Sequence, residues 1–597
     1  MLPEVKKHYG KVQNYYDGEF IDSEAERWLE VVNPATREVI AEVPCSSREE
    51  VTAAIDSAQA AYEDWRMTPP NIRVQPLFRL KTLMEQNYEK IARVLAQEHG
   101  KVIDEARGSV RRAIDNIEFA CGIPSLLMGE TLVDGAAAGI DEEAIRVPMG
   151  VFACVAPFNF PAMVPFWFWP MAVACGNTYV VKPSEQVPLS QNFIFELIEQ
   201  AGFPDGVINM VHGDRVVVDT LIDDPRVKGL SFVGSTPIAR LLYAKCAAAG
   251  KRVQCQGGAK NFLTVMPDAK LDAVMPNMVA SFFGNSGQRC LAGAVLVPVG
   301  DRADEVVEKF VAAAKSIKLG YALDPTAQMG PVAAGRHYER ILGYIQKGID
   351  EGATLLLDGR DPQVPGYEDG YFVGPTVFDH VKPDATIVRE EIFGPVVAIV
   401  RVKDLEEAIA LANTSAFGNS TAIYTGSGKA AREYTYRVDG GNVGINLGVA
   451  APRPTSPSVG CATASSEICT ARARTASTSS PTAASSSRAG CDRGHLLPRA
   501  QLLRHPGVLR PVAGAGGRRE GRRGRRGSHR AQTPEARAPA RADLPRAPQR
   551  GGAAAPHRHG SRRLPARRRP RPRRPGGAHR ALLRRRRHHR GRRADRC

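Results

Sequence analysis

From Gly150 onward the chain repeats one pattern, a short β-rich run followed by a segment with helical periodicity. The runs VFACVAPF, NTYVVKP, GVINMVHG, KGLSFVG and VQCQGG form a first set, and NFLTVMP, AGAVLVPV, VAIVRV and TAIYT form a second set after Lys260. Strands separated by helices must pair in parallel, with helices covering both faces of the sheet. We therefore expect an open α/β fold built from two α/β domains with a cleft between them.

The segment before Gly150 has a different pattern. Apolar residues recur at helical spacing between Ser47 and Ala120, as in REEVTAAIDSAQAAYEDW and LFRLKTLMEQNYEKIARVLAQEHG. The stretch GETLVDGAAAGIDEEAIRVPMG then alternates around Gly and Asp, which predicts a β-hairpin at about residues 129–148.

The net charge of +17 is unevenly distributed. Residues 453–597 hold 37 Arg, no Lys and 6 acidic residues, so the preceding 452 residues carry a net charge of about −14 together with every Lys, Phe, Tyr and Trp. A basic average would suggest a nucleic-acid partner. The Arg/Pro/Ala-rich tail, however, cannot bury enough apolar surface to fold, and we expect it to be disordered.

A shifted reading frame is a further explanation of this tail. Reading each codon from its third base, TARARTASTSSPT permits the peptide GQGKDGVDFFTD, and the preceding stretch permits YFPFGGLRDSFLGDLH. Both peptides have the mixed aromatic and acidic composition of folded protein. We favour a frameshift near residues 452–454 over a biological nucleic-acid-binding arm.

The 11 cysteines form no CxxC pair and no spacing typical of metal ligands, so we expect free thiols and no metal. The start of the chain has neither a secretory nor a transit pattern, and the longest apolar run, MVPFWFWPMAVAC, is too short to span a bilayer. These features favour a cytoplasmic protein.

Two strand ends carry candidate dinucleotide-binding residues. In FVGSTPIA, Ser235 opens a helix after a strand, and free N–H groups at such an end suit a pyrophosphate. In VVKPSE, Lys182 and Glu185 follow a strand and could bind ribose hydroxyls. Taken singly, an ordinary capped turn explains FVGSTPIA equally well, and a solvated loop is the better explanation of VVKPSE.

The stretch FGNSGQRCLAG places Cys290 after a small, polar loop, with Arg289 beside the sulfur. A lone cysteine is more often buried and inert, but a neighbouring cation favours a nucleophilic thiolate. Asn159 in PFNFP could donate to a developing oxyanion. EIFGP places the Glu391 carboxylate and the Phe393 ring on one turn.

Together and in this order, APFNFP, KPSE, FVGST, GQRC and EIFGP resemble the aldehyde dehydrogenase superfamily over about residues 15–450. The resemblance implies a thiohemiacetal and then a thioester on Cys290, with Asn159 and the Cys290 N–H as oxyanion hole. It implies NAD held by Phe158, Lys182, Glu185, Ser235, Glu391 and Phe393. It also implies an NAD-binding domain of residues 1–128 and 149–258, an oligomerisation hairpin at 129–148 and a catalytic domain at 259–452, followed by the tail 453–597.

One motif departs from the hydrolytic members of that superfamily. They carry a glutamate that activates the deacylating water, whereas this chain reads VQCQGGAKN, with Cys255 or Gln256 at that position depending on the alignment. Because a general base contributes about 10²–10⁴-fold to such a step, hydrolysis should be slow. Coenzyme A is then the expected acyl acceptor, and an inactive or differently based enzyme is the alternative.

GAKN and GQRC are most similar to the CoA-acylating methylmalonate-semialdehyde dehydrogenases. The resemblance implies methylmalonate or malonate semialdehyde as substrate, decarboxylation, and propionyl-CoA or acetyl-CoA as product, with a place in valine or inositol breakdown. Arg289 suits the substrate carboxylate. A second arginine is expected on the helix of VRRAIDNIEF, where Arg112 is the candidate, Arg111 the competing choice and a solvated helix face the alternative for Arg112. A homotetramer without membrane or biological nucleic-acid partners is expected for the family. Since the tail replaces the family's C-terminal segment, we expect this chain to assemble poorly.

Overall fold

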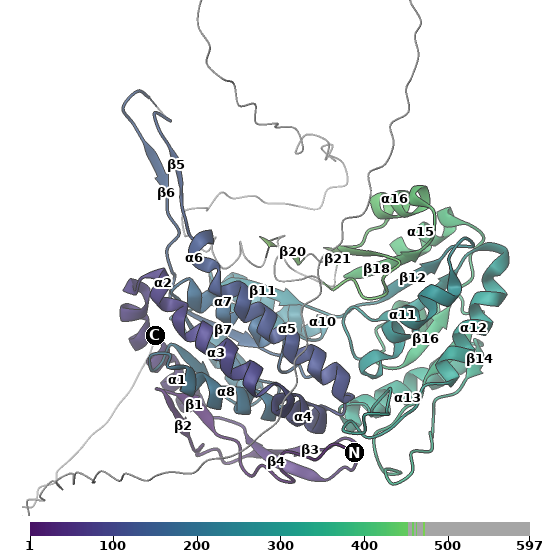
Figure 1. Ribbon diagram of the computed structural model, residues 1–597, viewed down its shortest axis with the longest axis horizontal. Helices are drawn as coiled ribbons and strands as arrows, with labels where there is room; N and C mark the ends of the chain where they lie inside the picture. Colours follow the sequence, from purple (N-terminus) through teal and green to yellow (C-terminus); the bar gives the residue numbers. More distant parts are fainter. Residues whose placement is uncertain (136, 452–456, 459–460, 463–469, 472–597) are drawn as a thin grey trace, which may run out of the picture. The chain divides into compact units, whose positions relative to one another are not determined.

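The computed structural model describes residues 1–135, 137–451, 457–458, 461–462 and 470–471, and it contains two seven-stranded sheets (Figure 1). The α/β class expected from the sequence is confirmed. Most of the tail 453–597 lies outside the described residues. The predicted disorder and the frameshift hypothesis concern that part of the chain. Within 457–471 three two-residue strands are described, β20 (Pro457–Ser458), β21 (Cys461–Ala462) and β22 (Thr470–Ala471).

The first sheet has the order β11-β10-β7-β8-β9-β1-β2. Its parallel part, from β11 to β9, is formed by the five runs of the first set, while β1 and β2 add antiparallel strands at one edge. The bounds are β7 (Val151–Val155), β8 (Thr178–Lys182), β9 (Ile208–Met210), β10 (Val227–Val233), β11 (Arg252–Gln256), β1 (Asn14–Tyr16) and β2 (Glu19–Ile21).

Helices cover both faces of this sheet, as the near-continuous apolar strands require. One face packs against α1 (Arg48–Met67), α9 (Arg215–Asp223) and α10 (Thr236–Ala248). The other packs against α3 (Gln75–Gln86), α4 (Tyr88–His99), α5 (Ile103–Cys121), α7 (Trp169–Ala174) and α8 (Leu189–Ala201). The helices expected between Ser47 and Ala120 are therefore confirmed, with the short α2 (Pro70–Arg73) and α6 (Ile123–Leu126) beside them.

The second sheet has the order β14-β15-β16-β13-β12-β18-β19 and is parallel except for β14. The four runs of the second set are β12 (Asn261–Val265), β13 (Gly293–Pro298), β16 (Val396–Ile399) and β18 (Ser420–Tyr424), and the remaining strands are β14 (Thr354–Leu357), β15 (Thr376–Asp379) and β19 (Asn442–Ile445). One face packs against α11 (Leu271–Phe283) and α12 (Ala303–Lys315). The other packs against α13 (Gly335–Asp350), α14 (Thr386–Arg389) and α15 (Leu405–Asn413), and α16 (Gly428–Arg437) packs on α15.

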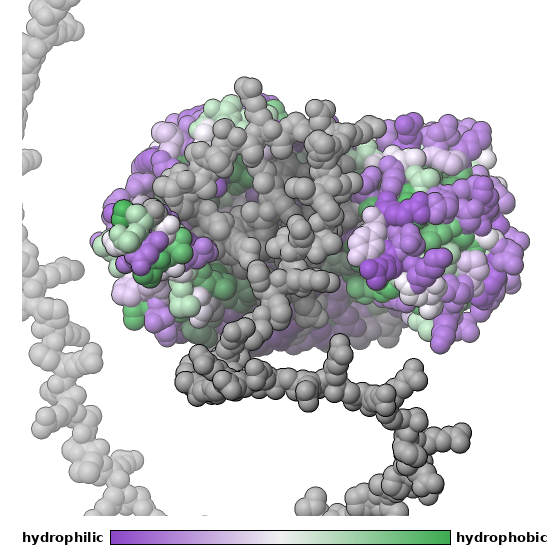
Figure 2. All heavy atoms as spheres, turned by 90° about the horizontal axis from the view of Figure 1, so that it is seen from above, coloured by the Kyte–Doolittle hydropathy of each residue, from purple (hydrophilic) through white to green (hydrophobic). Residues whose placement is uncertain are grey.

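Four smaller antiparallel pairings complete the described sheets: β3 (Trp28–Val32) with β4 (Val39–Pro44), β17 (Phe417–Gly418) with β21, β20 with β22, and β5 (Glu130–Leu132) with β6 (Glu142–Ala144). The β5–β6 pair is the hairpin predicted at 129–148, and it projects away from the first sheet (Figure 1). Its large apolar side chains are exposed, among them Leu132, Val133 and Ile140. Figure 2 looks down on this arm and shows hydrophobic and hydrophilic surface side by side.

No helix among the described residues is both long and apolar enough to cross a membrane.

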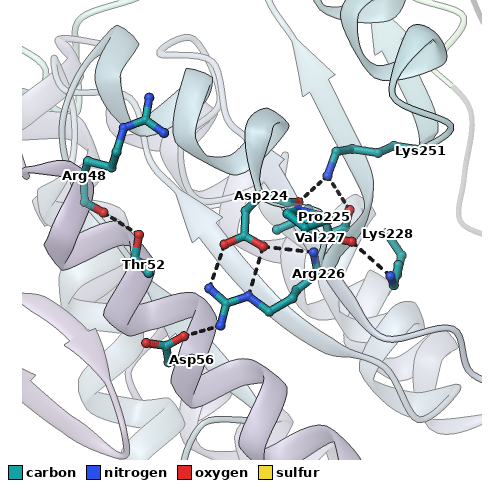
Figure 3. A network of polar contacts seen from close by, with 9 residues as sticks. All are labelled: Arg48, Thr52, Asp56, Asp224, Pro225, Arg226, Val227, Lys228 and Lys251. Atoms are coloured by element: carbon teal, nitrogen blue, oxygen red, sulfur yellow. Dashed lines mark hydrogen bonds and ion pairs between the residues drawn. The ribbon is translucent and has the colours of Figure 1, made fainter. Parts of the chain in front are cut away.

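The turn leading into β10 is held by a network of polar contacts (Figure 3). Arg226 pairs with Asp224 at 2.7 Å between Nη2 and Oδ2 and also with Asp56 on α1. The ammonium of Lys251 donates to the carbonyl oxygens of Asp224 and Val227. This network joins α1, β10 and the start of β11 at the amino end of the strands.

Candidate active site

Cys290 lies in the loop between α11 and β13, and the loop backbone is unusual. Asn285, Ser286 and Gly287 have positive φ angles of 54°, 52° and 71°. A Cβ at position 287 would lie 2.2 Å from the carbonyl oxygen of Gly394, so only glycine allows the loop to approach the EIFGP turn so closely. The small residues before the cysteine are therefore required by the backbone path that presents the half-buried Cys290.

Side-chain amides fix the backbone of the cysteine itself. Asn261 donates from Nδ2 to the carbonyl oxygens of Cys290 at 3.0 Å and Ala292 at 2.7 Å. Asn419 donates to the Cys290 carbonyl at 3.3 Å. The peptide unit that carries the Cys290 N–H is held separately, because its Arg289 carbonyl oxygen accepts from the Ala292 N–H at 3.1 Å. An oxyanion-hole donor needs an N–H direction that is fixed in this way.

Asn159 follows β7 and is buried beside the cysteine loop. Its Nδ2 donates to the carbonyl oxygen of Gln288 at 3.0 Å, which uses one of the two amide hydrogens. The backbone carbonyl oxygen of Asn159 accepts a hydrogen bond from the ammonium of Lys101 at 2.6 Å. The structure thus brings Asn159 and the Cys290 loop together, as the sequence predicted.

A pocket of about 80 Å³ opens against the cysteine. Arg112, Asn116 and Arg289 supply its polar lining, and its apolar lining is Phe160, Met163, Trp167, Leu291 and Val449. Arg111, the competing sequence candidate, instead forms a bidentate ion pair with Glu85, at 2.6 and 2.8 Å, on the outer face of α5. Of the two candidates, Arg112 is therefore the one that lines this pocket.

Arg289 has a protein partner that the sequence did not indicate. Its Nη2 lies 2.6 Å from Oε1 of Glu105, and its Nη1 donates to the carbonyl oxygen of Ala280 at 3.2 Å. A Cβ at Gly284 would lie 2.5 Å from both Nη atoms, so the guanidinium rests on the loop backbone. Arg289 still lines the pocket, but part of its charge and two of its donor groups are already engaged.

The residues predicted to bind ribose hydroxyls and the pyrophosphate lie at carboxyl ends of the first sheet's strands. At the end of β8 the ammonium of Lys182 pairs with the Glu185 carboxylate at 2.8 Å. Burial would raise the pKa of Glu185, but the Lys182 charge and hydrogen bond lower it below its usual value. Ser235 is the N-cap of α10 and makes no side-chain capping bond. Thr236 Oγ1 accepts from the Gly258 N–H at 2.9 Å, which fixes the start of α10.

The other predicted NAD-binding residues, Glu391, Phe158 and Phe393, form a second cluster. Glu391 accepts a bond from the Ala259 N–H at 2.8 Å, and a Cβ at Gly258 would lie 2.2 Å from Glu391 Oε2. Burial raises the pKa of the Glu391 carboxyl, although the Ala259 N–H and the buried Lys260 oppose that shift. The rings of Phe158 and Phe393 meet edge to face, with centroids 5.8 Å apart.

These positions fit a dinucleotide. A helix N-terminus with an unused cap hydroxyl suits a pyrophosphate, and paired Lys and Glu groups at a strand end suit ribose hydroxyls. Among the described residues no group of His, Cys, Asp or Glu side chains could hold a metal ion.

The two candidate positions in VQCQGGAKN differ in burial, because they lie on opposite faces of β11. The Cys255 side chain is fully buried in the core formed with α1, α9 and α10, whereas Gln256 is partly exposed. Neither position carries a carboxylate. Gln256 is therefore the position at which a general base would be accessible, and it is an amide here.

Sequence reasoning missed Lys101, Glu105, Asn261 and Asn419, which hold the two loops of the site. The only available signal was the i, i+4 spacing of Lys101 and Glu105 in GKVIDEA at a helix start.

Comparison with known proteins identifies the family to which the chain belongs. The model of the aldehyde dehydrogenase family matches residues 20–466. Malonate-semialdehyde dehydrogenase 2 of Geobacillus thermodenitrificans is 48% identical over 442 residues, covering 74% of this chain and 91% of the relative. Malonate-semialdehyde dehydrogenase of Pseudomonas aeruginosa is 44% identical over 444 residues, covering 74% and 89%.

Solved structures agree with these relatives. Methylmalonate-semialdehyde dehydrogenase from Oceanimonas doudoroffii superposes with a TM-score of 0.76 at 42% identity, covering 78% of this chain and 96% of that one. A structure from Sinorhizobium meliloti 1021 complexed with NAD, assigned to the same enzyme type, gives a TM-score of 0.77 at 39% identity, with coverage of 79% and 96%. With this fold, this site and these matches, the chain belongs to the aldehyde dehydrogenase family.

Proposed function

We propose that this protein oxidises malonate or methylmalonate semialdehyde with NAD and passes the acyl group to coenzyme A. The proposal is supported by the nature of its relatives, several of which are malonate-semialdehyde dehydrogenases at 44–48% identity. It is also supported by a small pocket that combines Cys290 with arginine side chains.

The first step is addition of the Cys290 sulfur to the aldehyde carbon. The carbonyl oxygen gains negative charge, which the second Asn159 amide hydrogen and the Cys290 N–H stabilise. NAD, held by Lys182, Glu185, Ser235, Glu391, Phe158 and Phe393, supplies the hydride acceptor when it is bound. Loss of hydride from the thiohemiacetal carbon leaves a thioester on Cys290.

The substrate carboxylate is held by Arg112, with Arg289 contributing the donors that Glu105 leaves unused. In the thioester this carboxylate lies β to the carbonyl carbon. When the bond to CO2 breaks, its electron pair moves into the thioester as an enolate, whose oxygen uses the same oxyanion donors. A proton from water then adds to the carbon and completes the propionyl or acetyl group.

Release of the acyl group is the step on which the CoA assignment depends. Gln256 is a neutral amide where a carboxylate base would activate water, so water is a poor acceptor. A CoA thiolate needs no base at that position, and exchange between two thioesters is nearly thermoneutral. The amide at Gln256 is the single observation that carries this part of the proposal.

Rapid mixing with NAD and malonate semialdehyde tests it. Without CoA we expect one burst of NADH, stoichiometric with Cys290, followed by slow turnover. With CoA we expect sustained turnover and acetyl-CoA as product. Sustained NADH and free acid formation without CoA would instead identify a hydrolytic aldehyde dehydrogenase that uses another base.

A further inference from the structure

The start of α5 faces both halves of the reaction centre. Lys101 lies just before the N-cap residue Val102, and Glu105 lies in the first turn, four residues after Lys101. Each makes a short polar contact with a different loop, and neither has a role in the mechanism above.

Lys101 holds the loop of the oxyanion donor. Its ammonium is fully buried, donates to the Asn159 carbonyl oxygen at 2.6 Å and lies 4.1 Å from the centroid of the Phe160 ring. An ammonium is rarely buried without a specific partner because desolvation is costly. The contact therefore fixes the peptide on which the Asn159 side chain is mounted.

Glu105 holds the loop of the nucleophile at two points. Its Oε1 accepts from the Asn285 N–H at 2.7 Å and from Arg289 Nη2 at 2.6 Å. The side chains of Glu105 and Arg289 are only 18% and 20% exposed, so water screens this ion pair weakly. Asn285 is the first residue of the left-handed run before Cys290, and Arg289 is the residue next to the cysteine.

The two loops come from different sheets. Asn159 follows β7 of the first sheet, and Cys290 precedes β13 of the second. Lys101 and Glu105 are joined by the N-cap and the first turn of one helix, so their two contacts fix the separation of the groups that they hold. The Asn285 side chain adds a cross-link by donating to the Asn159 carbonyl at 3.4 Å.

We propose that Lys101 and Glu105 form a bracket that sets the distance between the Asn159 amide and the Cys290 sulfur. Both act as positioning residues, because neither needs to contact substrate or cofactor. The inference rests on the proposed roles of Cys290 and Asn159.

The test compares Glu105→Gln and Lys101→Met with Glu85→Gln. Glu85 is the matched control because it, like Glu105, pairs with an arginine. Its partner is Arg111, on the outer face of α5. Turnover is measured with CoA and either malonate semialdehyde or propionaldehyde, which lacks the carboxylate. Misplacement of reacting groups by about 1 Å costs on the order of 10²-fold.

We expect Glu105→Gln and Lys101→Met each to lower kcat by about 10- to 100-fold with both aldehydes. The KM values should stay within about twofold, while Glu85→Gln behaves as wild type. The double variant should lose less than the product of the two single factors, because both residues set one distance. Hydrogen exchange of the peptide containing residues 284–290 should rise in Glu105→Gln and not in Glu85→Gln.

Three results would overturn the bracket. One is wild-type kcat in Glu105→Gln, and another is fully multiplicative losses in the double variant. The third is a change in KM confined to malonate semialdehyde, which would mean that Glu105 acts only on substrate binding through Arg289. Glu105→Asp, which keeps the charge but shortens the reach, replaces Glu105→Gln if that variant does not fold, with the same kcat loss expected. If turnover by the wild-type enzyme does not depend on CoA, the proposed function is wrong. The hydrogen exchange of residues 284–290 tests the positioning role of Glu105 independently of that result.

Discussion

Two ion-pair networks serve opposite ends of the protein's parallel strands. Figure 3 shows the one at the amino end, where Arg226 joins Asp224 and Asp56. The other lies beyond the carboxyl end of β7 in the first sheet, where Lys101 contacts the Asn159 loop and Glu105 contacts the Cys290 loop that precedes β13. Both networks tie a helix to a loop, and both use an arginine.

They differ in burial and in what they hold. The side chains of Arg226 and Asp56 are 33% and 59% exposed, so solvent and salt weaken their attraction. Lys101 is completely buried, and burial lowers the pKa of its ammonium to about 7. The amino-end network closes a turn that supports the sheet, while the buried one fixes reacting groups. The same chemistry should therefore affect stability at one end and turnover at the other.

The largest effect is expected where a donor contacts the reacting oxygen. Replacing Asn159 by Ala removes one of two oxyanion donors and should lower kcat by about 10²–10³-fold. The rate of the NADH burst, measured by stopped-flow absorbance, gives this factor directly. Arg226→Gln is the control at the amino end, and an equal loss of burst rate in that variant would remove the distinction between the two networks.

The next effect separates two neighbouring arginines of α5. Arg112→Leu should raise the KM for malonate semialdehyde by about 10- to 100-fold, the value of a charge-assisted hydrogen bond. The KM for propionaldehyde should change little. Arg111→Leu should leave both KM values near wild type because Arg111 pairs with Glu85 instead. Steady-state kinetics with the two aldehydes decide the matter, and a reversed pattern would mean that Arg111 contacts the substrate.

A smaller effect is expected from Arg226→Gln. A partly exposed ion pair of this kind contributes about 0.5–1 kcal/mol, and its loss should lower Tm slightly without changing kcat. Differential scanning calorimetry at neutral pH measures the change. A large fall in Tm would indicate that the network of Figure 3 does more than close its turn.

The smallest effect is the pH dependence of that same contribution. Hydrogen bonds from Arg226 lower the pKa of Asp224 below its usual value. The stabilisation is therefore complete above the unfolded-state pKa of about 3.9 and is lost as pH falls through the lower native value. The Tm difference between wild type and Arg226→Gln should thus vanish in acid. A difference that stays constant throughout the acid range in which the protein remains folded would show that the charge of Asp224 is not involved.

The sequence predicted the sheets well because each strand carries its own signal. Period-two and continuous apolar runs are local properties, and the nine runs identified after Gly150 all form strands. The motifs also predicted which residues lie close together, since Asn159 lies beside the cysteine loop and Phe158 against Phe393.

The same reasoning could not predict side-chain contacts between residues that are far apart in the sequence. Nothing local to Arg289 indicates that its charge faces Glu105, 184 positions earlier in the chain. The choice between Arg111 and Arg112 depended on the rotation of α5 about its axis, which spacing alone does not fix. The choice between Cys255 and Gln256 depended on which face of β11 each side chain occupies.

The contact of Gly287 with Gly394 limits how this enzyme could be redesigned. The nucleophile loop has no room for a side chain at that point, and three consecutive left-handed residues leave it no alternative path. Insertions or randomised residues there should abolish function rather than alter it. Mutant libraries intended to change substrate scope should instead target the opposite wall of the pocket, at Asn116, Met163 and Trp167.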